Sequence, residues 1–406
     1  MDVTALRRSW RQFTVAGPRA VKYFYASLFV IAPETRTMFP TNMRYQEDKL
    51  LAALGHILTH VDDAEELTAF THRLGADHRR FQARDADGNV IHLAEHHYIW
   101  VGQALLATLE HFLGTAWTPA LKAEWAAAYE AVAKLMLAGA AESERSLPPY
   151  WEAQVLDVDR RLVDLVVLTV RPNYLCAYRP GQSLPVQLPD LRMWRYLSPA
   201  NAPRPDGTIE FHVRATGRFS THLVRRTGVG DRLLLGHPVG TTLSSYDRAP
   251  HRPLLLVAGG SGLAPLRAVV ESLRQGPARS VTLVVGGKTP SDLYDHQALA
   301  MLASTASAGQ SAGERWLRYV PTVEAGWGWE GAVGTAVDVA LRLRSWEDSD
   351  VLVCGSPAMI RDTIRTLVDA GVPPDQILTE TFDHTSYPPI VASPDTSRPL
   401  SRLGAR

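Results

Sequence analysis

A glycine-rich turn after an apolar run carries the clearest chemical signal in the chain. The run Leu254–Ala258 has the length of a buried strand, and the residues that follow it are Gly259, Gly260, Ser261, Gly262, Leu263, Ala264 and Pro265. Glycines let a backbone approach a pyrophosphate closely, and the N-terminus of a following helix favours its negative charge. The turn therefore indicates a nucleotide site, although such glycine turns also arise for structural reasons alone.

Two further segments could contact the same kind of ligand. Cys354 and Gly355 follow another apolar run, and ligands of parallel sheets bind outside the carboxyl ends of the strands. Gly217 and Ser220 lie just before a short helix predicted over residues 221–226, which is a weaker signal for a pyrophosphate. A buried thiol at the end of a strand is an equally good interpretation of Cys354.

Among the fourteen histidines, His78 has the surroundings expected of a metal ligand. It lies one helical turn after Leu74 and one before Phe81, so a helix would place it on an apolar face. The other helical histidines lack the paired spacing of a known metal site, and we expect most of them to be structural or exposed.

Three segments with different patterns must position these residues. Residues 1–147 have apolar side chains at three- and four-residue spacing, as over residues 21–29, which predicts an all-α domain of six or seven helices. Residues 148–250 contain short β-rich runs separated by turn residues and one short helix, which predicts a small antiparallel β-barrel.

Residues 251–388 alternate strands with helices, which predicts an α/β domain with a parallel, doubly wound sheet. The predicted strands cover residues 254–258, 281–285, 317–323, 351–354 and 377–381. The predicted helices cover residues 265–274, 295–303, 333–342 and 357–370. Residues 389–406 are rich in Pro, Ser and Arg, and we expect a disordered tail there.

Composition excludes several classes of protein. The 406 residues include 42 Lys and Arg against 42 Asp and Glu, so a basic nucleic-acid surface is not expected. Two cysteines cannot build a disulfide scaffold or a four-cysteine zinc site, and they suit a reducing cytoplasm. The charged N-terminus lacks the apolar core of a signal peptide, and no apolar stretch is long enough to span a bilayer. We therefore expect a multidomain cytoplasmic protein with no obligate protein partner.

The helical segment resembles a globin, and more narrowly the globin domain of flavohaemoglobins. The closest matches are residues 17–29, GPRAVKYFYASLF, and residues 98–109, YIWVGQALLATL. The resemblance implies a b-type haem with His78 as the proximal iron ligand. It also implies that Phe39, at a Met-Phe-Pro corner, wedges the porphyrin.

The same resemblance implies roles on both sides of the haem. Tyr25 and Gln46 would form the distal pair on the side where O₂ binds, with Leu50 shaping the pocket. Tyr98 and Glu142 would hydrogen-bond to the proximal histidine, and such a chain makes the ligand more electron-donating and fixes its ring. Taken singly, the tyrosines would be core aromatics, and Gln46 and Glu142 would be surface residues.

Residues 155–385 resemble the FAD- and NAD(P)-binding module of ferredoxin reductases. The match rests on an RxYS-like motif, the GGSGLAP loop, a CGSPAM turn and the closing Glu-Thr-Phe. The flavin contacts that the resemblance implies are Arg195, Tyr196, Leu197, Ser198, Gly217, Ser220, Glu380 and Phe382. The implied contacts with the nicotinamide nucleotide are Gly260, Ser261, Gly262, Leu263, Ala264, Pro265, Cys354 and Gly355.

Two residues depart from that pattern. Leu197 stands where the RxYS motif has an aromatic residue, and Ser183 stands where a tyrosine tends to follow the Pro-Gly-Gln turn. Both changes remove aromatic surface near the flavin. Either Tyr196 substitutes from the adjacent position, or FAD is held less tightly and has a changed redox potential.

The combined resemblance covers most of the chain and implies an NAD(P)H-dependent haem–flavin oxidoreductase. Electrons would pass from NAD(P)H to FAD and then to haem, and the implied activity is that of a nitric oxide dioxygenase, which converts nitric oxide and O₂ to nitrate. Three alternatives remain open: a reductase of peroxide, quinone or organic substrates, a gas-binding or gas-sensing globin with a degenerate reductase half, and a fused reductase whose helices bind no haem. Lys288 and Asp292 leave the choice between NADH and NADPH undecided.

Overall fold

The structure of the chain is a computed structural model that describes residues 1–40, 43–84, 90–93, 95–240, 242–274, 279–305, 316–325 and 328–380. These residues form two units. One unit holds residues 1–151 and 187–194, and the other holds residues 152–186 and 195–380. Phe382 and the predicted tail over residues 389–406 lie outside the described residues.

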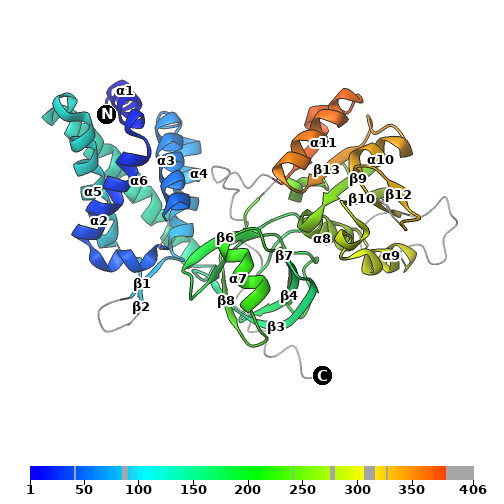
Figure 1. Ribbon diagram of the computed structural model, residues 1–406. Coiled ribbons are helices and arrows are strands. Elements are labelled where there is room, and N and C mark those ends of the chain that lie inside the picture. The colour runs from blue at the N-terminus through cyan, green and yellow to red at the C-terminus, as the bar shows by residue number, and fades with distance from the viewer. Residues whose placement is uncertain are drawn as a thin grey trace. The chain divides into compact units, whose positions relative to one another are not determined.

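The first unit is built from α-helices, as its apolar periodicity predicts (Figure 1). The helices are α1 (Val3–Ala16), α2 (Pro18–Ile31), α3 (Arg44–Thr59), α4 (Ala64–His78), α5 (Glu95–Leu113) and α6 (Pro119–Glu144), with 3-10 turns η1 (Pro33–Met38) and η2 (Gly114–Ala116). The side chain of Asp63 caps α4 by accepting the N–H of Glu66, and Thr118 caps α6 ahead of a first-turn proline. The number of α-helices among the described residues agrees with the prediction.

A small antiparallel pair of strands interrupts the helices. Strands β1 (Gln82–Arg84) and β2 (Val90–His92) pair so that Gln82 lies opposite His92. The sequence analysis predicted only helices over residues 1–147, so these two strands correct it. Three-residue strands are too short to show the alternation on which strand prediction depends.

Two glycines allow α4 and α6 to approach closely. A Cβ added to Gly75 of α4 would lie 1.8 Å from the carbonyl oxygen of Met136. A Cβ added to Gly139 of α6 would lie 2.3 Å from the Cα of His72. Because the opposing atoms belong to helix backbones, they cannot move aside as a flexible side chain would. This close packing positions the C-terminal end of α4, which carries His78.

Replacing Gly75 with alanine should therefore lower the free energy of unfolding by roughly 3 kcal/mol or more, since overpacking against rigid backbone forces the helices apart. Urea unfolding of the full chain, followed by circular dichroism, measures the change. Gly55→Ala in α3 is the matched control, because the nearest atom to its added Cβ is a Trp10 side-chain atom at 4.0 Å. Equal unfolding curves for the two variants would contradict the role given to Gly75.

A curled antiparallel sheet follows the helices and forms a half-barrel. Its strands are β3 (Trp151–Leu162), β4 (Leu165–Pro172), β5 (Leu184–Leu188), β6 (Met193–Leu197), β7 (Ile209–Arg214) and β8 (Arg232–Leu235), in the order β6-β5-β8-β3-β4-β7. A bridge between Pro199 and Phe211 connects the end of one outer strand to the other. Helix α7 (Arg218–Arg226) is the short helix that the sequence predicted.

The last part of the chain is a parallel sheet. Its strands are β9 (Leu254–Gly259), β10 (Val281–Gly287), β11 (Leu317–Val323), β12 (Ala332–Val333), β13 (Asp350–Cys354) and β14 (Ile377–Thr379), in the order β12-β11-β10-β9-β13-β14. All five strands predicted from the sequence are present, and every pairing is parallel. The predicted α/β fold is therefore confirmed.

Alternate residues of the central strand bury against helices on the two faces of this sheet. On one face, Leu254 and Leu256 of β9 share a core with α8 (Leu263–Leu273) and α9 (His296–Thr305). On the other face, Leu255 and Val257 share a core with α10 (Ala336–Leu343) and α11 (Pro357–Asp369). Burial on both faces explains why these strands read as continuous apolar runs.

Within the second unit, buried ion pairs connect the antiparallel sheet to the parallel-sheet layer. Asp295, whose side chain is fully buried, pairs with Arg161 of β3 and with Arg267 of α8, 3.2 Å away. Arg267 also pairs with Glu210 of β7 at 2.7 Å. Buried charges that are paired in this way hold a defined geometry, because separating them would leave an uncompensated charge.

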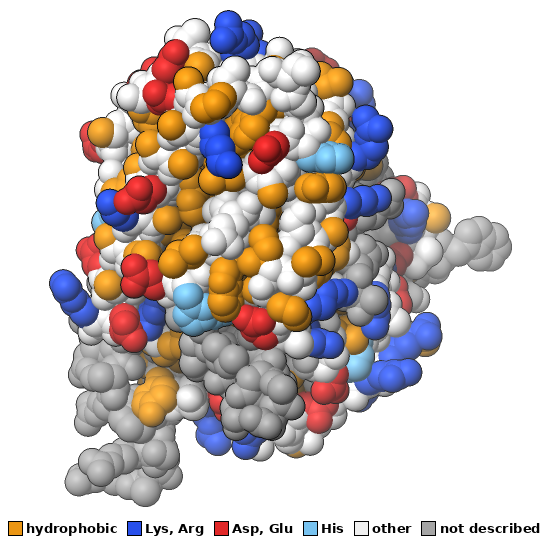
Figure 2. Space-filling model, turned by 90° about the vertical axis from the view of Figure 1, so that its left-hand side faces the viewer, with side chains coloured by type: hydrophobic (Ala, Val, Ile, Leu, Met, Phe, Trp, Pro, Cys, Tyr) orange, Lys and Arg blue, Asp and Glu red, His pale blue; other side chains and the backbone are white. Residues whose placement is uncertain are grey.

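The described surface agrees with the balanced composition. Figure 2 shows Lys and Arg side chains interspersed with Asp and Glu over the face that it presents. Among the helices that the structure describes, none is both long enough and apolar enough to cross a membrane.

Candidate functional site

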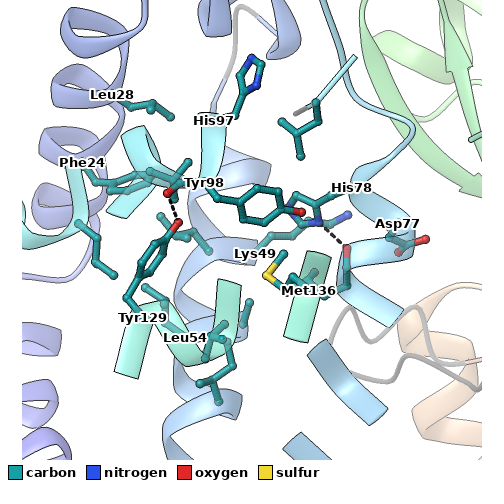
Figure 3. A pocket seen from close by; sticks show the side chains of 18 of the residues that line it. Phe24, Leu28, Lys49, Leu54, Asp77, His78, His97, Tyr98, Tyr129 and Met136 are labelled. Carbon is teal, nitrogen blue, oxygen red and sulfur yellow. Dashed lines mark hydrogen bonds between the residues drawn. The ribbon is translucent and has the colours of Figure 1, made fainter. Parts of the chain in front are cut away.

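The helical unit contains a cavity of about 260 Å³ with mainly apolar walls (Figure 3). Helices α2 to α6 all contribute side chains to it. Of the residues that the sequence singled out in this segment, the cavity brings together Tyr25, Phe39, Gln46, Leu50, His78 and Tyr98. Residues from four helices and the corner after η1 thus meet at one site. The two that are farthest apart in sequence, Tyr25 and Tyr98, are separated by 73 positions.

His78 reaches the cavity from the last residue of α4. Its Nδ1 lies 2.6 Å from the carbonyl oxygen of Leu74. A carbonyl can only accept, so Nδ1 carries the proton and the Nε2 lone pair is available to a ligand. Burial lowers the pKa of His78, which favours the neutral ring that metal binding requires. The imidazole is thus set up as a metal ligand with a fixed tautomer.

Tyr25 and Phe39 form one wall of the cavity. The Tyr25 hydroxyl donates a long hydrogen bond of 3.4 Å to the carbonyl oxygen of Gln46, and the ring meets Phe39 edge-on at 5.2 Å. Burial raises the pKa of Tyr25 above its usual value, so the hydroxyl stays protonated. A weakly held, neutral hydroxyl can turn toward a ligand in the cavity and donate to it. Gln46 and Leu50 line the same cavity from α3.

Tyr98 points toward His78 in Figure 3, and both side chains line the cavity. Burial raises the pKa of Tyr98 to about 12, so it too is a neutral donor. Its main-chain carbonyl accepts a hydrogen bond of 2.5 Å from the hydroxyl of Tyr129 on α6. Tyr129 is a site residue that the sequence analysis missed, and helical spacing gave no signal to distinguish it from a core aromatic.

The structure does not bring Glu142 to His78. Its exposed carboxylate lies 3.2 Å from Nδ1 of His72, with 72% of the side chain accessible. His72 and His78 are six positions apart on α4 and therefore on different faces of the helix. The hydrogen bond to the proximal histidine that the resemblance implied for Glu142 is thus replaced by a surface contact.

Within the described residues, no group of three or more His, Cys, Asp or Glu side chains is arranged to hold a metal ion. A metal in the helical unit would accordingly need most of its ligands from a non-protein group such as a porphyrin. An imidazole with a free Nε2 lone pair, as His78 provides in this largely apolar cavity, is the protein donor that a porphyrin-bound iron requires.

In the second unit, the glycine loop and the turn after β13 meet at one edge of the parallel sheet. A Cβ added to Gly262 would lie 2.5 Å from the backbone nitrogen of Gly355 and 2.6 Å from the carbonyl carbon of Cys354. Gly260 has a positive φ of 56°, and nothing lies within 4 Å of the Cβ position there. The loop thus combines a backbone-to-backbone contact with open space for a ligand.

Several residues of this loop can contribute only their backbones. Leu263 and Ala264 have 1% and 3% of their surface exposed, and Pro265 is also buried in the first turn of α8. Ser261 is half-buried and keeps a hydroxyl at the loop surface. The Cys354 side chain is fully buried, so it lies under the site rather than facing open space.

The residues of the RxYS-like motif end strand β6. Arg195, Tyr196 and Leu197 are half-buried, and Ser198 follows them in a buried position. Successive side chains of a strand point to opposite faces, so Tyr196 lies on the face opposite Leu197. The tyrosine therefore does not take over the position of the missing aromatic side chain.

Gly217 and Ser220 lie at the start of α7. The Ser220 hydroxyl accepts the N–H of Gly217 at 3.1 Å and that of Thr216 at 2.9 Å, so it caps its own helix. A Cβ added to Gly217 would meet nothing within 4 Å, which leaves the approach to this helix N-terminus open. Backbone N–H groups there could hold a phosphate, as the sequence predicted.

Asp292, the acid that could meet a ribose hydroxyl, already has partners. Its carboxylate accepts the N–H of Thr289 at 3.0 Å and lies 3.5 Å from the Arg214 guanidinium. These contacts lower the pKa of Asp292 although its partial burial opposes them. Lys288, directly after β10, is exposed. The structure leaves both nicotinamide nucleotides possible.

Comparison with known proteins follows this division of the chain. Residues 22–136 match the Globin family, and residues 256–365 match the Oxidoreductase NAD-binding domain family. A flavohemoprotein from Deinococcus radiodurans is 29% identical and aligns over 92% of this chain and 94% of its own length. The chain has the domain combination of a flavohaemoprotein, a globin and an NAD-binding oxidoreductase domain. It is accordingly an oxidoreductase of the haem–flavin, NAD(P)H-dependent type.

Two further comparisons concern the fold and the reductase part. A crystal structure of a flavohemoglobin from Malassezia yamatoensis, with bound FAD and heme, has the same fold, with a TM-score of 0.68 at 18% identity over 94% of this chain and 98% of the other. A ferredoxin–NAD(P)⁺ reductase from Metapseudomonas resinovorans is 30% identical over 57% of this chain and 68% of its own length. The part of the chain that this reductase matches is thus 57% of its length.

Proposed function

We propose that this chain is a nitric oxide dioxygenase that consumes NAD(P)H, O₂ and nitric oxide and forms nitrate. The observation that carries the proposal is the half-buried His78, whose Nε2 lone pair is available in a cavity that also holds the Tyr25 hydroxyl. When bound, haem, FAD and NAD(P)H supply the redox chemistry, in which a hydride is divided into single electrons that reduce O₂ in the presence of nitric oxide.

The cavity of the helical unit fits a haem. His78 would hold the iron through Nε2, because its Nδ1 is committed to Leu74. Phe39 and Leu50 would pack against the porphyrin as apolar walls and exclude water from its faces. Tyr98 lines the same cavity but cannot donate to the imidazole, because Nδ1 of His78 donates to Leu74 and Nε2 would bind the iron, so the bond to Leu74 itself would hold the ring orientation.

Tyr25 would stabilise charge that develops on oxygen during the reaction. Its hydroxyl is protonated at every working pH, because burial raises its pKa. The long bond to the Gln46 carbonyl costs little to break, so the hydroxyl can be redirected at the reacting oxygen. A preorganised donor in a dry cavity acts more strongly there than it would in water.

The second unit fits a flavin and a nicotinamide nucleotide. The backbone of the loop from Gly260 to Pro265 would hold the nucleotide pyrophosphate, because Gly262 packs on the turn after β13 and the space at Gly260 is open to a ligand. The N-terminus of α7 would hold an FAD phosphate, and Arg195 and Ser198 would approach it from the end of β6. These assignments concern backbone and side-chain positions and leave the coenzyme preference open.

The test is to load the full-length protein with haem and FAD and supply NADH or NADPH, O₂ and nitric oxide. We expect nitric oxide to disappear, with nitrate formed in equal amount, as followed by an electrode and by ion chromatography. Reduced haem without nitrate formation would contradict the dioxygenase proposal. Turnover of a peroxide or quinone in its place would favour a different haem–flavin reductase.

Tyr25→Phe should reduce the rate of nitric oxide consumption by roughly 100-fold, the usual cost of losing one preorganised donor. Haem content, measured by the Soret absorbance, should stay normal, because the ring and its contact with Phe39 remain. Tyr23→Phe is the matched control on the same helix, since Tyr23 is partly exposed and stacks on His111 away from the cavity. An unchanged rate in Tyr25→Phe would remove Tyr25 from the reaction.

A further inference from the structure

Four polar side chains from distant parts of the second unit meet at the carboxyl edge of the parallel sheet. Ser183 lies just before β5, Ser198 just after β6, Cys354 at the end of β13 and Glu380 just after β14. The Ser183 hydroxyl donates to Oε1 of Glu380 at 2.9 Å and lies 3.0 Å from the Ser198 hydroxyl. Ser198 donates to the same carboxylate oxygen. The three oxygens therefore lie within hydrogen-bond distance of one another, and the two serine hydroxyls can both donate to the Glu380 carboxylate.

Ser183 is the most firmly fixed member of this group. Its backbone N–H donates to the carbonyl of Val239, and its carbonyl accepts the N–H of Val239, both at 2.8 Å. The residue itself has only 7% of its surface exposed. A small side chain on a doubly anchored backbone has few alternative positions, so its hydroxyl can determine where the Glu380 carboxyl lies.

The surroundings make the charge of Glu380 sensitive to these bonds. Burial raises the pKa of Glu380, and the hydrogen bonds from Ser198 and Ser183 oppose that rise. Among the described residues, the ionisable group that interacts with it is Cys354, whose own pKa is raised by burial, so the thiol stays protonated. Removing one of these hydrogen bonds should therefore raise the pKa of Glu380 further.

Full reduction of a flavin by NAD(P)H takes up a proton, which a nearby acid can supply. FAD, NAD(P)H and one proton give the fully reduced flavin and NAD(P)⁺, and two protons are returned when the two electrons leave singly. Ser198 belongs to the flavin motif, and dinucleotides bind at the sheet edge where Cys354 and Glu380 lie. A carboxyl at this edge, connected to a hydroxyl, can supply and recover the proton.

We propose that Ser183 is a positioning residue that holds the Glu380 carboxyl against Ser198 and thereby controls proton exchange between this carboxyl and the flavin. The proposal rests on the flavin site of the proposed function, but not on the reaction with nitric oxide. It gives the departure from an aromatic residue at position 183 a chemical reason. A bulky ring would not provide a hydroxyl within reach of Oε1 of Glu380 from this anchored backbone.

The test compares Ser183→Ala with Ser183→Thr in the full-length, haem- and FAD-loaded protein. The FAD midpoint potential is measured as a function of pH by anaerobic spectroelectrochemistry, without O₂ or nitric oxide. Hydrogen bonds to the ionised carboxylate lower its pKa. Removing one should therefore raise, by about one unit, the pH at which the slope of the potential against pH changes. Ser183→Thr keeps the hydroxyl and should leave that pH unchanged.

Two further variants separate this role from general stability. Glu380→Gln should abolish the change in slope, and adding Ser183→Ala to it should then have no further effect. Ser245→Ala is a neutral control, because this exposed hydroxyl bonds only to the Thr242 carbonyl. Three results would overturn the proposal. In the first, Ser183→Ala changes slope at the same pH as the wild type; in the second, Ser183→Thr shifts that pH as much as Ser183→Ala does. In the third, the wild-type chain retains no FAD. Normal potentials in a protein that fails to consume nitric oxide would contradict the dioxygenase function alone.

Discussion

Replacing His78 with alanine should abolish haem retention by the full-length chain. The bond from its Nδ1 to the Leu74 carbonyl leaves the Nε2 lone pair of His78 available to iron in the cavity. Losing an outer partner of a metal ligand typically weakens binding about 10–100-fold, so losing the ligand itself should cost more. Soret absorbance after haem supplementation and gel filtration measures the loss.

His72→Ala is the matched control for this experiment. It lies on the same helix, but its ring contacts the exposed Glu142 rather than the cavity. We expect it to retain haem at the wild-type level. Addition of free imidazole to His78→Ala should restore part of the Soret band, because the cavity keeps its shape. Full haem retention without His78 would show that another residue ligates the iron.

Gly262→Ala should reduce the rate of flavin reduction by NAD(P)H at least about 100-fold, as expected when reacting groups are misplaced by about 1 Å. The added Cβ would lie 2.5 Å from the backbone nitrogen of Gly355 and 2.6 Å from Cys354, and neither backbone can move aside without separating the two loops. Stopped-flow measurement of flavin absorbance under argon, with NADH and with NADPH, gives the rate.

Two observations would make this result specific. Reduction of the variant by dithionite should remain normal, because the flavin site itself is intact. Gly228→Ala should behave as wild type, since its added Cβ meets nothing within 4 Å. A Gly262→Ala protein that NAD(P)H reduces at the normal rate would show that the close contact between the loops is unnecessary for nucleotide binding.

Much of the fold could be predicted because the relevant signals are local. Strand β9 reads as a continuous apolar run because helices cover both faces of the sheet, and the glycines after it mark the strand-to-helix turn. Helix α4 was predictable because Leu74 and His78 lie one turn apart on an apolar face. The same spacing places the Leu74 carbonyl where it can accept from Nδ1 of His78. In these cases the interactions that determine the structure join residues only a few positions apart in sequence.

Other features needed long-range information. Glu142 could be assigned only by counting along α6, and the contact with His72 depends on how α4 and α6 cross. That crossing depends on Gly75 and Gly139, whose missing side chains give no sequence signal beyond small size. Strands β1 and β2 were missed because a three-residue strand is stabilised by its partner rather than by its own pattern.

The sequence by itself determined the order of the three kinds of fold, the choice of His78 as a candidate ligand, and the glycine loop. Each of these depends on the types and spacing of residues that are close in sequence. Only the tertiary structure decided that Glu142 contacts His72, that Tyr129 supports Tyr98, and that Ser183 bonds to Glu380 across 197 positions of sequence. A hydrogen bond requires two atoms within about 3 Å. Whether side chains from separate strands and helices meet at that distance is fixed by packing.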